Sequence, residues 1–227
     1  MIEVEGVDER NKIACRIVEQ SSVNWTEGNL TAHSCGFLVS HSSLIVNRVT
    51  VARPRSAAII ADSADLQGAE LVLSNIPKFG IVTLGNETSV SLGSMRVDAE
   101  PRLENNLPVY ATAGRIEIAK VEIADCDCCF FVDPKREFID LRELTEKLGL
   151  KEPIGLIEPV EPSPPQVAVF SDLLILKKCK YVWVFNGAGT SRVKQINCDI
   201  TGEMLLKTNK LTQKGADLTN FEISEAK

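Results

Sequence analysis

The most conspicuous group of reactive side chains in this sequence is the stretch Cys-Asp-Cys-Cys at residues 126–129. Thiolates bind zinc and other soft metals, but a tetrahedral site needs ligands from at least two segments of chain. A second segment would have to supply Cys179 or Cys198, or the pair His33 and Cys35. No second cysteine or histidine pair at the spacing of common zinc sites occurs in the sequence, so we expect buried thiols that pack in the core. The candidate metal ligands are His33, Cys35, Cys126, Cys128 and Cys129.

Nucleophilic catalysis would need a base, and the only two histidines of the sequence are His33 and His41. A serine or cysteine nucleophile works with such a base at hydrogen-bonding distance. Both histidines lie in serine-rich stretches typical of loops or strand edges, and the sequence contains no nucleophile elbow, phosphate-binding loop or zinc-protease motif. We therefore predict no catalytic residue and no cofactor-binding residue, and the sequence favours a protein that is not an enzyme.

The elements that would position these side chains are mostly short strands. Through the first 130 residues, runs rich in β-branched residues alternate with Gly, Asn, Pro and Asp at the spacing of a sandwich or barrel. No internal repeat of fixed period is evident, which argues against a solenoid. The predicted fold is mainly β, a barrel or sandwich of short antiparallel strands. The predicted strands are 12–19, 36–40, 44–52, 57–60, 70–73, 80–84, 107–112 and 115–123.

A hairpin is predicted within residues 103–123, and its second strand shows the clearest alternation in the chain. Ile116 and Ile118 are expected to point inward, and Lys120 toward water. A change of register near Ala119 interrupts the alternation, and a β-bulge could absorb it.

One helix is predicted at residues 134–148. Asp133 and Pro134 supply an N-cap and a first-turn proline, and apolar residues then recur at helical spacing up to Gly149. Residues 152–166 contain five prolines, which is the composition of an extended linker or surface crossing. The predicted parts are a β-rich domain at 1–150 that ends in the helix, a proline-rich crossing or linker at 151–166, and a β meander at 167–227 that packs on the first part.

Residues 35–114 show an order of apolar segments that resembles the first barrel of trypsin-like serine proteases, particularly the HtrA kind. The matching segments are 36–40, 44–47 and 79–84. In that family these positions are the strands next to the catalytic histidine and aspartate. Here Arg48, Val49 and Thr50 stand in place of the histidine, and Gly80 in place of the aspartate. The resemblance therefore implies a degenerate protease barrel that serves as a scaffold, since a triad without base and acid cannot activate a serine.

Composition excludes some partners and compartments. A net charge of −6 gives no broad positive field, which disfavours nucleic acid as a partner. The seven cysteines form no disulfide framework, and the sequence shows neither a secretory leader nor an apolar run long enough to span a membrane. We expect a cytoplasmic protein without a membrane span.

The favoured function is a noncatalytic β-rich module that binds a protein partner or a second copy of itself. The proline-rich segment and exposed strand edges are the expected contacts, because extended segments and unpaired edges often dock peptides or subunits. The alternative is a metal- or thiol-dependent enzyme organised around His33, Cys35 and residues 126–129.

Overall fold

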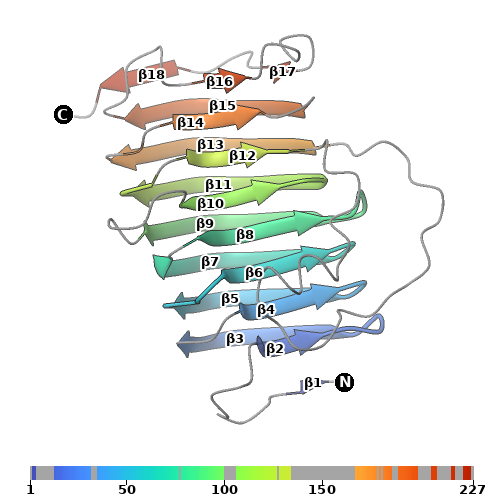
Figure 1. Ribbon diagram of the computed structural model, residues 1–227. Coiled ribbons are helices and arrows are strands. Elements are labelled where there is room, and N and C mark those ends of the chain that lie inside the picture. The colour runs from blue at the N-terminus through green and yellow to red at the C-terminus, as the bar shows by residue number, and fades with distance from the viewer. Residues whose placement is uncertain are drawn as a thin grey trace.

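The aliphatic and β-branched runs of the sequence form strands that stack into a parallel β-solenoid in the computed structural model (Figure 1). None of the described residues is helical. The residues that the structure describes are 2–3, 13–31, 35–76, 78–99, 106–126, 128–133, 167–177, 179, 181–185, 189–198, 206–208, 216–217 and 222–225. The predicted helix at 134–148 and the proline-rich segment at 151–166 lie outside these residues.

The strands belong to two nine-stranded sheets. Sheet A contains β1 (Ile2–Glu3), β2 (Ile13–Ile17), β4 (Cys35–Ser40), β6 (Ala57–Asp62), β8 (Phe79–Leu84), β10 (Leu107–Ala111), β12 (Cys128–Val132), β14 (Tyr181–Phe185) and β16 (Leu206–Thr208). Sheet B contains β3 (Ser22–Thr31), β5 (Ser43–Ala52), β7 (Asp65–Ile76), β9 (Ser89–Ala99), β11 (Gly114–Ala124), β13 (Val167–Lys177), β15 (Gly189–Cys198), β17 (Ala216–Asp217) and, paired with β15, β18 (Glu222–Glu225).

From β2 to β17, consecutive strands lie in opposite sheets, so the predicted antiparallel barrel or sandwich is wrong. β1 pairs with β2 in antiparallel orientation, and every other described strand pair is parallel. Each coil runs along sheet A, turns, and returns along sheet B. Phe37 pairs with Ile59 and Ile59 with Ile81, which gives a coil of 22 residues. The structure thus contains the internal repeat that was not evident in the sequence.

The turns explain why the chain changes sheet and does not form hairpins. His41, Ser63 and Gly85 follow successive strands of sheet A and all have positive φ, at 46°, 46° and 73°. The left-handed conformation directs the chain away from its own sheet. The turns stack on one another, because the His41 N–H donates to the Asp62 carbonyl at 3.0 Å and the Ser63 N–H to the Leu84 carbonyl at 3.0 Å.

The strands of sheet B break their in-and-out alternation at one position, which we call the corner. There two consecutive residues face outward, for example Ala119 and Lys120 between the buried residues Ile118 and Val121. The register change expected near Ala119 is therefore confirmed, although the predicted hairpin is wrong: β11 pairs with β9 and β13, not with β10. Corners of successive strands stack because the coils are in register.

The protease resemblance is also overturned by the pairing. Its paired strands would be β4 and β5, yet β4 pairs with β2 and β6 in sheet A, and β5 with β3 and β7 in sheet B. A trypsin-like barrel is built from antiparallel neighbours, so the likeness was one of apolar patterns only.

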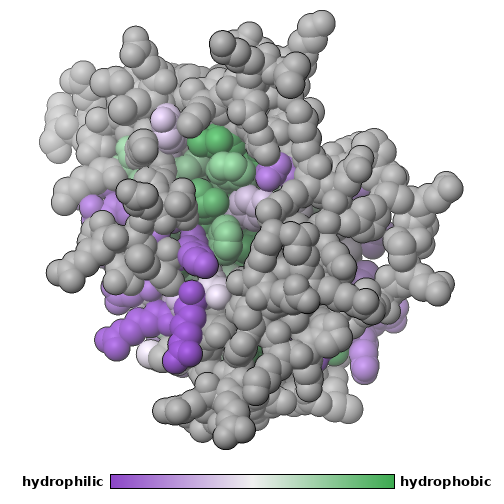
Figure 2. Space-filling model, in the orientation of Figure 1, coloured by the Kyte–Doolittle hydropathy of each residue, from purple (hydrophilic) through white to green (hydrophobic). Residues whose placement is uncertain are grey.

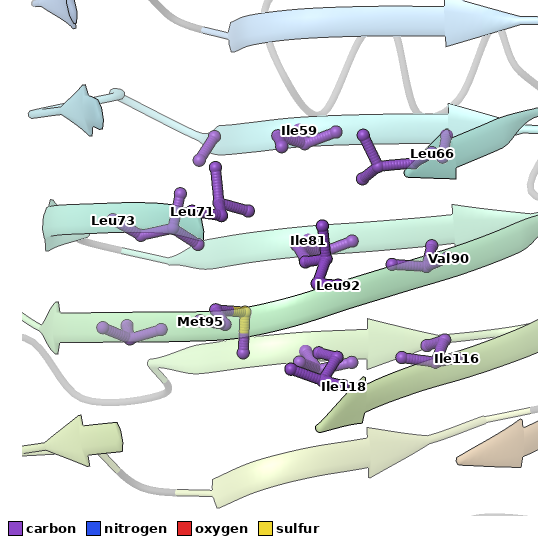
Figure 3. Close-up of a cluster of buried hydrophobic side chains, with 14 of the residues drawn as sticks. Ile59, Leu66, Leu71, Leu73, Ile81, Val90, Leu92, Met95, Ile116 and Ile118 are labelled. Carbon is purple, nitrogen blue, oxygen red and sulfur yellow. The ribbon is translucent and has the colours of Figure 1, made fainter. Parts of the chain in front are cut away.

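The main hydrophobic core fills the space between the two sheets. Figure 3 shows aliphatic side chains from both sheets, such as Ile59 and Ile81 from sheet A and Leu66, Leu92 and Ile118 from sheet B, gathered in stacked rows. All of these are at most 3% exposed. Close packing of such rows at every coil contributes most of the stability of a solenoid.

The outer face of sheet A is apolar and buried as well. A second cluster there contains Leu38, Ile60, Val82 and Tyr110, which alternate with the inward residues along their strands. Figure 2 shows apolar side chains over the middle of this face. Strands buried on both faces have continuous apolar runs, as parallel sheets usually do.

The stack continues beyond residue 166. β13 pairs with β11 from Gly114↔Val167 to Ala124↔Lys177, and β14 pairs with β12. The division of the chain at residues 150 and 166 stays a prediction.

Candidate functional site

A row of polar side chains crosses sheet B at the corner. The row consists of Glu27, Arg48, Glu70, Ser94 and Lys120, which are register partners on β3, β5, β7, β9 and β11. We call this the corner row. Neighbouring strands are about 4.8 Å apart, so these side chains present polar groups at a regular spacing.

A recess lies along the corner row. Its volume is about 430 Å³, and it is lined by Glu27, Asn47, Arg48, Ala69, Glu70 and Ser94. Small residues beside the row create the hollow, since Ala69 is flanked by Gly93 at the equivalent position of the next coil. The recess is open and polar, a shape suited to side chains of an extended partner and not to an enclosed small molecule.

The charged side chains around the recess form exposed ion pairs. Arg48 Nε donates to Glu70 Oε2 at 2.8 Å, and these side chains are 69% and 40% exposed. Further pairs on the same surface join residues two apart on one strand, namely Arg115 with Glu117, Lys120 with Glu122, and Arg96 with Asp98. Exposed ion pairs stabilise a fold little, so both partners remain available to bind other charged groups.

The corner row and its recess were not predicted from the sequence. Arg48 and its partner Glu70 are 22 residues apart, so no local pattern joins them. The corner row does have a signal in the sequence. Two consecutive outward residues, such as Asn47 and Arg48, stand between buried ones in strand after strand.

The structure brings Cys126 to Cys179, with their sulfur atoms 3.0 Å apart, but it keeps Cys35 far from the 126–129 stretch. Cys35 and Cys128 occupy equivalent positions on sheet A, and each Sγ donates to a carbonyl two residues ahead at 3.1 Å. The row between them contains Ala57, Phe79 and Leu107, so four strand spacings of about 4.8 Å separate the two cysteines by about 19 Å. His33 lies outside the described residues. Across the ranges with described side chains, no three His, Cys, Asp or Glu residues are placed to hold a metal ion.

The thiols of the 126–129 stretch are buried, as predicted. Cys128 is 2% exposed and Cys129 is fully buried. Burial raises the pKa of Cys129 well above its ordinary value. The pKa of Cys126 is raised mainly by a hydrogen bond with Cys179 and, to a lesser extent, by burial. Cys126 and Cys129 are therefore protonated at neutral pH, which disfavours metal ligation and slows nucleophilic attack, since both require the thiolate.

His41 does not form a catalytic pair with a serine. The nearby carboxylate of Asp62 accepts hydrogen bonds from Ser40 Oγ and Ser63 Oγ, both at 3.4 Å. Burial raises the pKa of Asp62, while the charge of His41 and the two hydroxyls oppose that rise. Because the hydroxyls are directed at a carboxylate, this cluster stabilises the stacked turns and provides no activated nucleophile.

Among the described residues there is no helix with the length and apolarity needed to cross a membrane. No family model, curated protein or solved structure matches this chain.

Proposed function

We propose that this protein is a noncatalytic scaffold module, acting in the cytoplasm, that binds a protein partner along the recess at the corner of sheet B. The observation that carries the proposal is the corner row itself, in which five stacked strands place polar groups in register beside a hollow. An extended peptide or a surface strand with alternating charges would complement it.

The rest of the solenoid supports this function by keeping the row rigid. Val46, Leu71 and Met95 are buried beside the corner and are at most 1% exposed. A surface fixed by its core loses little conformational entropy on binding, so weak individual contacts add up efficiently. Charge complementarity would mainly supply specificity and a fast association rate.

Site-specific photo-cross-linking in cells tests the proposal. A photoreactive amino acid at Ser94, in the recess, should give one or a few discrete protein adducts, whereas the same group at Glu87, in the exposed turn after β8, should give several-fold less. Adding Arg48→Glu should reduce the Ser94 adduct at least several-fold, because it places like charges beside each other. Equal adducts at both positions, or none at Ser94, would reject the proposed surface.

A further inference from the structure

Two cysteines from different coils occupy equivalent positions in the stack. Ala124 is the register partner of Lys177, and Cys126 and Cys179 each lie two residues further along. The coils remain in register past the strand ends, because the Asp125 N–H donates to the Lys177 carbonyl at 3.0 Å. Parallel neighbours are about 4.8 Å apart, which falls within the Cα separation of about 4.4–6.8 Å found in disulfides.

The side chains of these cysteines point toward each other. The Cys126 and Cys179 sulfur atoms are 3.0 Å apart, and the two residues are 5% and 6% exposed. This distance is shorter than an ordinary contact between two thiols, so a covalent bond requires only a small further approach. By contrast, the sulfur atoms of Cys35 and Cys128 each donate to a carbonyl of their own strand.

We propose that Cys126 and Cys179 are a disulfide-forming pair, oxidised by a low-molecular-weight disulfide such as oxidised glutathione. One cysteine loses its proton and attacks the oxidant, whose S–S bond breaks and releases one glutathione thiolate, which takes up a proton. The second cysteine then loses its proton and displaces the second glutathione in the same way. The protein gains one S–S bond and loses two hydrogen atoms, and the oxidant is reduced to two thiols.

The bond would tie together two coils that are joined by a long stretch of chain. The two cysteines are 53 residues apart, whereas the usual spacing between coils is 22 residues. A disulfide stabilises more when it closes a longer loop. Oxidation is therefore expected to stabilise the solenoid where β13 stacks on β11, and burial is expected to make the reaction slow.

Mass spectrometry of the full-length protein, equilibrated in reduced or oxidised glutathione and then alkylated, tests the pairing. Trypsin should release residues 121–135 linked to Cys179-Lys180 from the oxidised sample, and reduction should separate them. Cys126→Ser and Cys179→Ser should each abolish this species, whereas the matched control Cys129→Ser should retain it. Absence of the linked peptide in the wild type, or its persistence in Cys126→Ser through another cysteine, would overturn the proposal.

Thermal melting gives an independent measurement. Oxidation should raise the melting midpoint of the wild type and of Cys129→Ser by several degrees, and that of Cys126→Ser by none. A midpoint that falls on oxidation, or that rises equally in Cys126→Ser, would show that the bond does not fit the native coils.

Discussion

Sheets A and B are built from neighbouring pieces of the same coils, yet their outer faces differ. On sheet A, β4 and β6 are buried at every residue, and their outward side chains include Leu38 and Ile60. On sheet B, outward residues such as Arg48 and Glu70 are exposed and charged. The two sheets share parallel pairing, and their outer faces differ in their outward side chains, which are apolar and buried on sheet A and charged and exposed on sheet B.

The largest expected effect comes from a charge on the outer face of sheet A. Ile60 is fully buried, so Ile60→Asp should cost about 4 kcal/mol or more of unfolding free energy, and Ile60→Ala about 2–5 kcal/mol. Ile45, on the outer face of sheet B, is 40% exposed. Ile45→Asp should therefore cost about 1 kcal/mol or less, measured by urea denaturation. Equal losses of unfolding free energy in Ile60→Asp and Ile45→Asp would show that the outer faces of sheets A and B do not differ in burial.

Two phenylalanines, one buried and one partly exposed, test the same comparison and should give the next largest difference in stability. Phe130 of β12 is fully buried and stacks on Trp183 with ring centroids 6.5 Å apart. Phe170 of β13 is partly exposed beneath the Arg115 guanidinium, 4.9 Å from its ring centroid. Phe130→Ala should cost about 3–5 kcal/mol. Phe170→Ala should cost about 1 kcal/mol, because it removes an exposed cation–π contact. A greater loss at Phe170 in calorimetry would contradict the assignment of inner and outer rows.

The carboxyl group of Asp62 is buried at the end of β6, and its titration should have a smaller effect on stability than the substitutions above. Burial raises the pKa of Asp62, so the folded protein holds this proton more tightly than the unfolded chain does. Stability should therefore fall as pH rises from about 4 through the raised pKa, with a slope of at most about 1.4 kcal/mol per pH unit from this group.

Denaturation across this pH range would detect the contribution. Asp62→Asn should flatten the profile. Ser63→Ala removes a hydrogen bond that lowers the pKa of Asp62, so it should extend the loss to higher pH. An unchanged profile in both variants would show that Asp62 does not titrate in this range.

The smallest effect is expected on the outer face of sheet B. A double-mutant cycle with Arg48→Ala and Glu70→Ala should give a coupling energy of about 0.2–1 kcal/mol, because both side chains are exposed. The coupling should shrink further in high salt. A coupling above about 2 kcal/mol would mean that the pair stabilises the fold and is not held available for a partner.

Strand positions were predictable from the sequence, but their pairing was not. The predicted segments 44–52, 80–84 and 115–123 correspond closely to β5, β8 and β11. The same alternation suits a hairpin or a solenoid coil, so local pattern does not distinguish them. The continuous apolar run of β6, Ala-Ala-Ile-Ile-Ala, was the evidence for a parallel sheet buried on both faces.

The repeat and the corner row were hidden for a related reason. Coils share apolar character and not residue identity, and their spacing grows from 22 residues to 28 between Ile81 and Val109. Glu27, Arg48 and Glu70 become neighbours only once that register is known. The burial of Cys128 and Cys129 was predictable because it depends only on the apolar residues next to them.

The unequal spacing of the coils also affects how the chain folds. In a stack each coil needs only its neighbour, so structure can begin at any coil and grow by closing loops of about 22 residues, a local and therefore fast process. The step from β11 to β13 closes about 53 residues, which costs only about 0.8 kcal/mol more in chain entropy. Folding that spreads from coil to coil should therefore pause briefly at this step. The coils before it and the coils after it should exchange their amide hydrogens at two distinct rates.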